Sequence, residues 1–120
     1  MFRAYTITSG KGGVGKTTLT VNLGISLALL DRETYILDAD IGMANMALIL
    51  GMDQVPVTLH EVLAGKADIE DAVYEGPAGV KVVPSGISLQ GFQQADPDKL
   101  RDVMHKLVDR CEYLMIDAPS

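Results

Sequence analysis

Four short apolar runs set the pattern of this chain. They cover residues 4–8, 34–37, 80–83 and 113–116, are rich in β-branched and aromatic side chains, and show no alternation of polar and apolar positions. Strands that are covered on both faces of a parallel sheet have this pattern. We therefore expect four parallel strands, each buried on both faces.

The interval between the first two strands has the periodicity of a helix. Across residues 17–30 the leucines recur at helical spacing and form one stripe, and Asp31 and Arg32 follow the last of them. The leucines of the stripe are Leu19, Leu23, Leu27 and Leu30. This spacing predicts a helix that ends near Asp31, so the first part of the chain reads as a βαβ unit.

A second amphipathic helix is expected before the last strand. Asp96 and Pro97 form an N-cap and a proline that the first helical turn accepts. Apolar residues then recur at helical spacing at Leu100, Val103, Met104, Leu107, Val108 and Cys111. Two short helices are expected at residues 57–64 and 67–73, and the glycines and proline of residues 75–79 predict a loop. This alternation of strands and helices predicts an α/β fold.

Composition and charge narrow the function classes. The chain has 120 residues, of which 48% are hydrophobic and 22% charged, as in ordinary globular domains. A net charge of −6 argues against broad binding to nucleic acid, which needs clustered basic residues. The single cysteine excludes an internal disulfide, and the opening residues do not have the plan of a signal peptide. We expect a cytoplasmic protein that does not span a membrane.

The last predicted strand stands almost at the end of the sequence. Only residues 118–120 follow Asp117, too few for the helix and neighbouring strands that bury a parallel sheet. We therefore expect residues 1–120 to be the N-terminal part of a single domain, truncated after this strand.

A glycine-rich segment between the first strand and the first helix has the pattern of a phosphate-binding loop. Residues 9–18 match G-x-x-x-x-G-K-[ST] in the strand–loop–helix context that the motif requires. The candidate nucleotide-binding residues are Gly10, Lys11, Gly12, Gly13, Val14, Gly15, Lys16, Thr17 and Thr18. The glycines allow main-chain N–H groups to surround phosphates, Lys16 adds a charge for the β- and γ-phosphates, and Thr17 adds a hydroxyl for Mg²⁺. A glycine-rich turn without a ligand is the poorer account of this context.

Carboxylates stand at the ends of two predicted strands, where open α/β sheets bind their ligands. Asp38 and Asp40 follow the second strand, and Asp117 ends the last one. A carboxylate at the end of an apolar strand, as at Asp117, has the Walker B arrangement, in which it points toward Mg²⁺. Turn or helix-cap formation is the alternative for these residues and for the nearby Asn45.

The phosphate loop resembles the deviant Walker A box of the MinD/ParA superfamily of P-loop ATPases, which carries a second lysine early in the loop. Lys11 stands at that position. In this superfamily two subunits face each other with ATP between them. The resemblance implies that Lys11 acts on the partner's phosphates and Lys16 on those of its own subunit. A solvated loop lysine is the alternative for Lys11.

The segment of residues 38–45 is similar to the first switch of the same family, Asp-x-Asp-x-Gly-x-x-Asn. The resemblance implies that Asp38 helps to hold the Mg²⁺ shell, that Asp40 orients or deprotonates the attacking water, and that Asn45 assists at the phosphates. The candidate metal ligands are then Thr17, Asp38 and Asp117. The candidate catalytic residues are Lys11, Lys16 and Asp40.

Two further segments carry a weaker resemblance. Residues 117–120 look like the start of the second switch of the family. Residues 83–86 read Val-Pro-Ser-Gly and resemble the Pro-x-Gly segment that follows a strand in MinD-type proteins. For residues 83–86, a plain turn is almost as good an account.

The resemblance as a whole implies a three-layer, Rossmann-like P-loop NTPase fold with the Asp117 strand beside the first strand. It implies an ATPase that uses ATP and Mg²⁺, turns over slowly, forms an ATP-dependent homodimer and exposes a surface for a regulatory protein. The sequence of residues 42–47 is more similar to prokaryotic MinD-like proteins than to ParA; it reads Gly-Met-Ala-Asn-Met-Ala. We therefore expect a spatial regulator of cell division in the cytoplasm, with peripheral association at the inner face of the cell membrane through residues beyond 120.

Three alternatives remain open at this point. The first two are a ParA-type DNA partition ATPase, which the acidic charge disfavours, and an Mrp-type iron–sulfur cluster scaffold ATPase. The third is an interaction module that binds nucleotide without hydrolysing it.

Overall fold

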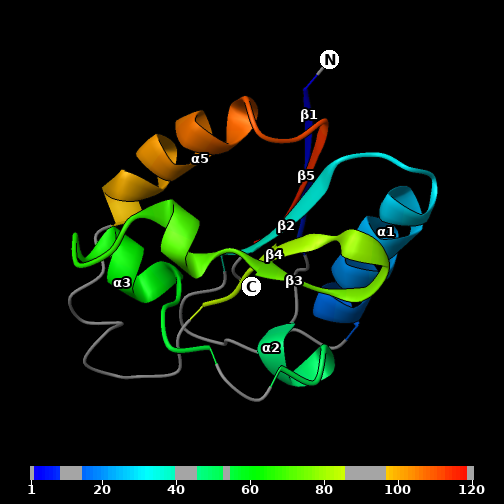
Figure 1. Ribbon diagram of the computed structural model, residues 1–120, viewed down its shortest axis with the longest axis horizontal. Helices are drawn as coiled ribbons and strands as arrows, with labels where there is room; N and C mark the ends of the chain where they lie inside the picture. Colours follow the sequence, from blue (N-terminus) through cyan, green and yellow to red (C-terminus); the bar gives the residue numbers. More distant parts are fainter. Residues whose placement is uncertain (1, 9–14, 40–45, 53–54, 86–96, 119–120) are drawn as a thin grey trace.

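The chain folds into three layers, with a central sheet between helices on both faces (Figure 1). The computed structural model describes residues 2–8, 15–39, 46–52, 55–85 and 97–118. Helix α1 (Lys16–Leu29) covers one face of the sheet, and helices α3 (Leu59–Leu63) and α5 (Leu100–Val108) lie on the other. The predicted α/β fold class is confirmed.

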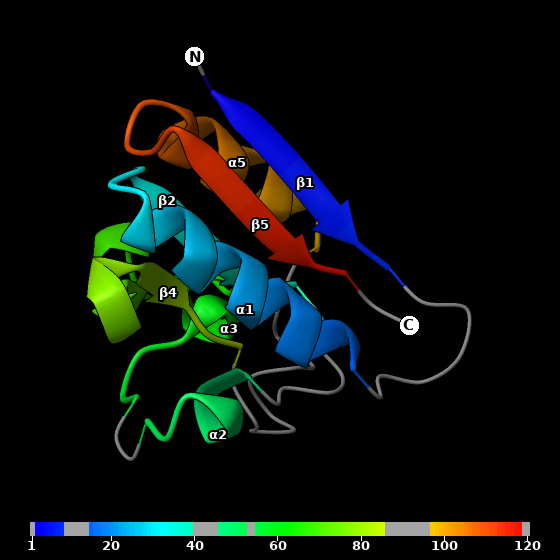
Figure 2. The same cartoon turned by 90° about the vertical axis from the view of Figure 1, so that its right-hand side faces the viewer.

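The sheet is mainly parallel. Among the described residues its strands lie in the order β1 (Arg3–Ile7), β5 (Tyr113–Asp117), β2 (Thr34–Asp38), β4 (Lys81–Val83) and β3 (Tyr74–Glu75). All neighbouring pairs are parallel except β3 with β4. The last strand of the chain thus lies between β1 and β2, which confirms the expected neighbour of the first strand (Figure 2).

The register aligns the carboxyl ends of three strands. Asp117 of β5 is the partner of Ile7 in β1 on one side and of Asp38 in β2 on the other. Main-chain hydrogen bonds continue past these pairs, from the Ala118 N–H to the Ile7 carbonyl and from the Ala39 N–H to the Asp117 carbonyl, both 3.0 Å. One edge of the sheet therefore collects the ends of β1, β5 and β2.

Two apolar cores form because successive strand residues face opposite sides of the sheet. Ile36 and Met115 pack in the core that includes Val21 of α1. Leu37 packs in the other core, which includes Leu107 of α5. All residues of β2 are buried, as expected for a strand with helices on both faces.

Strand β1 departs from this expectation. Four of its five residues are exposed, and the ring of Tyr5 is stacked on that of Tyr113 at a centroid distance of 6.3 Å. β1 lies at the edge of the sheet, and α1 and α5 lie over the strands further in (Figure 2). The prediction that this strand is buried on both faces is therefore wrong for the described chain.

Helix α1 confirms the predicted helix but turns a different face to the sheet. Leu19 and Leu23 of the leucine stripe are 50% and 39% exposed, whereas Thr20, Val21 and Gly24 are buried. Small side chains allow the helix axis to approach the sheet closely. At Gly24 a Cβ would lie 2.5 Å from Cδ1 of Ile36, so the helix could not lie this close with a larger residue there.

The shorter elements agree in part with the sequence. The helices expected at residues 57–64 and 67–73 correspond to α3 and to the 3-10 helix η1 (Ile69–Ala72). The loop expected at residues 75–79 is confirmed as the connection between β3 and β4, which contains the 3-10 turn η2 (Pro77–Gly79), except that Glu75 belongs to β3. Helix α2 (Met46–Ile49) was not expected. The second amphipathic helix is confirmed as η3 (Pro97–Lys99) and α5, and its expected N-cap Asp96 lies outside the described residues.

Candidate functional site

The end of the phosphate-loop motif leads directly into helix α1. Gly15 adopts a left-handed conformation with φ 85°, which glycine accepts without strain, and its carbonyl accepts a hydrogen bond from the Leu19 N–H. Lys16 and Thr17 follow as the first residues of the helix and are buried, whereas Thr18 is exposed. The predicted loop residues Gly10, Lys11, Gly12, Gly13 and Val14 lie outside the described residues.

A buried ion pair joins the start of α1 to the end of β5. Nζ of Lys16 lies 2.5 Å from Oδ1 of Asp117, and both side chains are 1% exposed. The same ammonium group donates to the main-chain carbonyl of Ala118. The candidate nucleotide-binding residue Lys16 and the candidate metal ligand Asp117 therefore contact each other directly.

Thr17 completes the contacts of the Asp117 carboxylate. Its hydroxyl donates to Oδ2 of Asp117 at 2.6 Å, and the ammonium group of Lys16 donates to Oδ1. The Thr20 hydroxyl donates to the Lys16 carbonyl at 2.8 Å and packs inside the first turn of the helix. The two side chains that open α1 are thus both directed at one carboxylate.

Asp38 stands beside this group. It is the register partner of Asp117 on the adjacent strand, and each residue is 1% exposed. Two carboxylates and the Thr17 hydroxyl form the all-oxygen set that Mg²⁺ prefers. Within the part of the chain that the structure describes, no three His, Cys, Asp or Glu residues group to hold a metal. The predicted residues Asp40 and Asn45 lie outside the described residues.

Ser85 is a neighbour of the site to which the sequence analysis gave no role. It is 3% exposed, and its hydroxyl donates to the main-chain carbonyl of Asp38 at 2.6 Å. The carbonyl of Pro84 accepts a hydrogen bond from the Leu59 N–H at 2.8 Å. The Pro-Ser segment after β4 is therefore fixed on both sides, and the proline directly after a strand was the signal that marked it.

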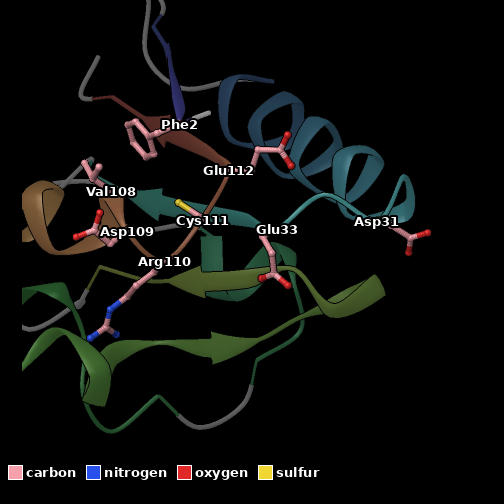
Figure 3. A pocket seen from close by; sticks show the side chains of 8 residues that line it. All are labelled: Phe2, Asp31, Glu33, Val108, Asp109, Arg110, Cys111 and Glu112. Atoms are coloured by element: carbon pink, nitrogen blue, oxygen red, sulfur yellow. The ribbon is translucent and has the colours of Figure 1, made fainter.

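A cavity of about 580 Å³ lies at the opposite ends of the strands (Figure 3). The charged side chains at its edge, among them Asp31, Glu33 and Glu112, point in different directions and do not converge on a common centre. The Cys111 thiol, also in the lining, donates to the Leu107 carbonyl at 3.4 Å, and burial raises its pKa to about 11. Cys111 is buried, and the cavity is separate from the phosphate-loop site.

The strand, the glycine turn and the helix bring a lysine and a threonine to strand-end carboxylates, and this arrangement defines a P-loop nucleotide-binding protein. The AAA domain family matches residues 2–120 of the chain. An uncharacterized ATP-binding protein of Methanocaldococcus jannaschii is 54% identical over 117 residues, which are 98% of this chain and 44% of that protein. The chain therefore spans about half the length of the curated relatives it matches.

Solved structures agree with the sequence relatives. The septum site-determining protein MinD of Pyrococcus horikoshii, complexed with Mg-ADP, has a TM-score of 0.95 and 42% identity. The alignment covers 100% of this chain and 50% of that chain. The MinC:MinD cell division complex of Aquifex aeolicus has a TM-score of 0.74 and 32% identity, with 97% and 47% covered. The chain belongs to the AAA domain family and, within it, to the MinD/ParA group of P-loop ATPases.

Among the described residues, no helix is both long enough and apolar enough to cross a membrane.

Proposed function

We propose that this chain carries the nucleotide site of an ATPase that binds ATP with Mg²⁺, hydrolyses it slowly and dimerises in the ATP-bound state. The observation that carries the proposal is the contact of Lys16 and Thr17, at the start of α1, with Asp117, at the end of β5. These are the residue types that P-loop enzymes place on phosphates and on Mg²⁺.

Nucleotide binding would require Lys16 to exchange partners. Its ammonium group is engaged by Asp117 and by the Ala118 carbonyl. A polyphosphate at the start of α1 would meet the positive end of the helix and could take the lysine in place of the carboxylate. The exchange would release Oδ1 of Asp117, so phosphate binding and preparation of the metal site would occur together.

Three oxygen-bearing side chains would hold the metal ion. Thr17 and Asp117 already share a hydrogen bond, and Asp38 lies next to Asp117 in the sheet. When bound, Mg²⁺ would neutralise charge on the β- and γ-phosphate oxygens. Support comes from the related MinD of Pyrococcus horikoshii, whose structure is complexed with Mg-ADP.

Hydrolysis and dimerisation rest on residues outside the described ranges. By the family resemblance, Asp40 would orient or deprotonate the attacking water, Asn45 would assist at the phosphates, and Lys11 would act across the dimer. A cation placed over the developing phosphoryl charge is a known source of rate acceleration. The fit of the fold to MinD supports these roles.

We further propose that the protein is a cytoplasmic, MinD-like spatial regulator of cell division with a regulatory protein as its partner. The MinC:MinD complex among the similar structures supports a partner of that kind. Peripheral contact with the inner face of the cell membrane would use residues beyond 120. The net charge of −6 disfavours direct binding of DNA by this part of the chain.

The decisive experiment is a calorimetric titration of the intact protein with Mg-ATP. Lys16→Ala should abolish binding, because the variant loses the cation that faces the β- and γ-phosphates. Lys81→Ala is the matched control, since the side chain of Lys81 is 35% exposed and its ammonium group lies 3.8 Å from the exposed carboxylate of Glu75. Unchanged affinity of the Lys16 variant would refute the site. Binding without single-turnover hydrolysis in the wild type would instead favour the non-hydrolysing interaction module.

A further inference from the structure

The hydroxyl of Ser85 contacts the main chain of a residue that the proposed function places at the metal ion. The hydroxyl lies 2.6 Å from the carbonyl oxygen of Asp38, 47 residues earlier in the sequence. That separation is at the short end of the range for good O–H···O hydrogen bonds. Because Ser85 is 3% exposed, water competes little for this contact.

The sequence explains why a side chain makes this bond. The pairing of β2 with β4 ends at Leu37 and Val83, and the next residue, Pro84, has no N–H to donate to the neighbouring strand. The Ser85 hydroxyl therefore supplies a donor to β2 beyond the point where the main-chain pairing stops. Asp38 remains tied to the sheet on its β4 side through this hydroxyl.

Ser85 is itself held in place by the next layer. The carbonyl of Pro84 accepts a hydrogen bond from Leu59, the first residue of α3. That helix begins with a capping box, in which the Glu61 side chain accepts hydrogen bonds from the N–H and the hydroxyl of Thr58 at 2.8 and 2.9 Å. The support behind Ser85 is thus a capped helix end that does not depend on the nucleotide site.

On its other side Asp38 is aligned with Asp117. The Ala39 N–H donates to the Asp117 carbonyl at 3.0 Å, directly after the register pair of Asp38 with Asp117. The segment that carries Asp38 is therefore fixed from β5 by the main chain and from β4 by the Ser85 hydroxyl. A metal ligand needs such support, because an error of about 0.5 Å in its position already weakens binding.

We propose that Ser85 is a positioning residue that fixes the Asp38 carboxylate for the Mg²⁺ of the bound nucleotide. This inference rests on the proposed function of the site. Ser85 acts through the main chain of Asp38 and has no contact of its own with the ligand. Its loss should therefore weaken the metal-dependent part of nucleotide binding and leave the phosphate contacts of Lys16 unchanged.

The test is to measure the affinity of the intact protein for ADP with Mg²⁺ and, separately, with EDTA. Ser85→Ala should weaken binding of Mg-ADP by about tenfold, as loss of a partner behind a metal ligand commonly does. Its affinity for ADP in EDTA should stay within about twofold of wild type, because Lys16 still binds the phosphates. Ser85→Thr keeps the hydroxyl. It should restore most of the gain in ADP affinity that Mg²⁺ gives the wild-type protein.

Thr34→Ala is the matched control. Thr34 lies at the other end of β2, is 2% exposed, and its hydroxyl donates to the Arg32 carbonyl at 3.0 Å. Loss of the Thr34 hydroxyl removes a hydrogen bond of the same kind, far from the carboxylates. It should change neither the affinity for Mg-ADP nor the affinity for ADP in EDTA. If Ser85→Ala does not fold, Ser85→Cys keeps the side-chain size with a weaker donor and should show the same selective loss.

The outcomes separate two failures. If Ser85→Ala weakens both affinities equally, or neither, the positioning role is wrong while the nucleotide site stands. If the wild-type protein binds ADP no more tightly with Mg²⁺ than in EDTA, the metal site of the proposed function is wrong, and the role of Ser85 fails with it.

Discussion

The ammonium group of Lys16 lies 2.5 Å from Oδ1 of Asp117, although 101 positions separate the two residues in the sequence. The contact joins the first residue of α1 to the last residue of β5, and both side chains are 1% exposed. Burial of one charge is costly unless the other is present. The pair therefore links the stability of the nucleotide-free protein to the two residues that would later bind the ligand.

Replacing one member of the pair should destabilise the nucleotide-free protein more than replacing both. Lys16→Met leaves a buried carboxylate without its cation, and Asp117→Leu leaves a buried ammonium without this carboxylate. We expect each to lower the free energy of unfolding by about 3–5 kcal/mol, whereas the double variant should lose much less. Urea denaturation of the intact protein measures all three.

The control is the pair of Arg32 with Glu112, whose side chains are 53% and 32% exposed. Its coupling energy should be below about 1 kcal/mol, because water screens exposed charges. Simple additivity of the Lys16 and Asp117 substitutions would mean that the buried pair contributes no coupling.

The action of Lys11 across a dimer can be tested by mixing two inactive variants. Lys11→Ala and Asp40→Ala should each be nearly inactive alone. Equal amounts of the two subunits should give about half mixed dimers, and each mixed dimer has one site with an intact Asp40 and the partner's Lys11. If the two sites of a dimer hydrolyse ATP independently, the mixture should have about a quarter of the wild-type activity. ATP hydrolysis of the mixture is the measurement, and cross-linking of tagged subunits checks that mixed dimers form. Activity that stays at the single-variant level despite abundant mixed dimers would exclude independent action across the dimer.

Gly24→Ala should destabilise the protein even though alanine is the better helix former. The new Cβ would lie 2.5 Å from Cδ1 and 2.6 Å from Cγ1 of Ile36, so the buried isoleucine must move. We expect a loss of about 1–3 kcal/mol in a thermal or urea melt. Ile36→Val should recover part of it, because it removes Cδ1. Ser26→Ala, on the exposed side of the same helix, should change stability by less than about 0.5 kcal/mol.

Cys111 should make the protein less stable at alkaline pH. Burial raises its pKa from the ordinary value of 9.0 to about 11, so the folded state holds the proton more tightly than the unfolded state. The stabilisation is complete below pH 9.0 and is lost as the pH rises toward about 11. Between these pH values the melting temperature should fall more steeply with rising pH for the wild type than for Cys111→Ala. Parallel curves would contradict the raised pKa, and rapid alkylation of the folded protein at pH 8 would contradict the burial.

Several parts of the fold could be predicted because their signals are local. The apolar runs of β2 and β5 and the helix that begins at Lys16 are visible in the sequence, and the structure contains all of them. The place of β5 beside β1 came from the family resemblance. Nothing in the local pattern gives the order of strands in a sheet.

Other features depend on tertiary contacts that a local pattern does not contain. The leucine stripe of α1 is mostly exposed, since the helix packs closely on the sheet through the face with Thr20 and Gly24. Strand β3 has only two residues and exists through its pairing with β4 and the hydrogen bonds of the Tyr74 hydroxyl with Val57. The role proposed for Ser85 could not be found without the distance to Asp38.

The insertion of β5 between β1 and β2 also has a consequence for protein synthesis. On the ribosome the chain grows from its N-terminus, so β1, α1 and β2 emerge long before the strand that must separate β1 from β2 in the finished sheet. Until β5 arrives, β1 lacks its native neighbour β5 and Lys16 lacks the Asp117 carboxylate. Insertion of β5 between β1 and β2 and contact of Lys16 with Asp117 therefore occur in one step. A nascent chain that stops short of residue 113 should retain no Mg-ATP, and the gain of nucleotide binding during translation would report the insertion of β5.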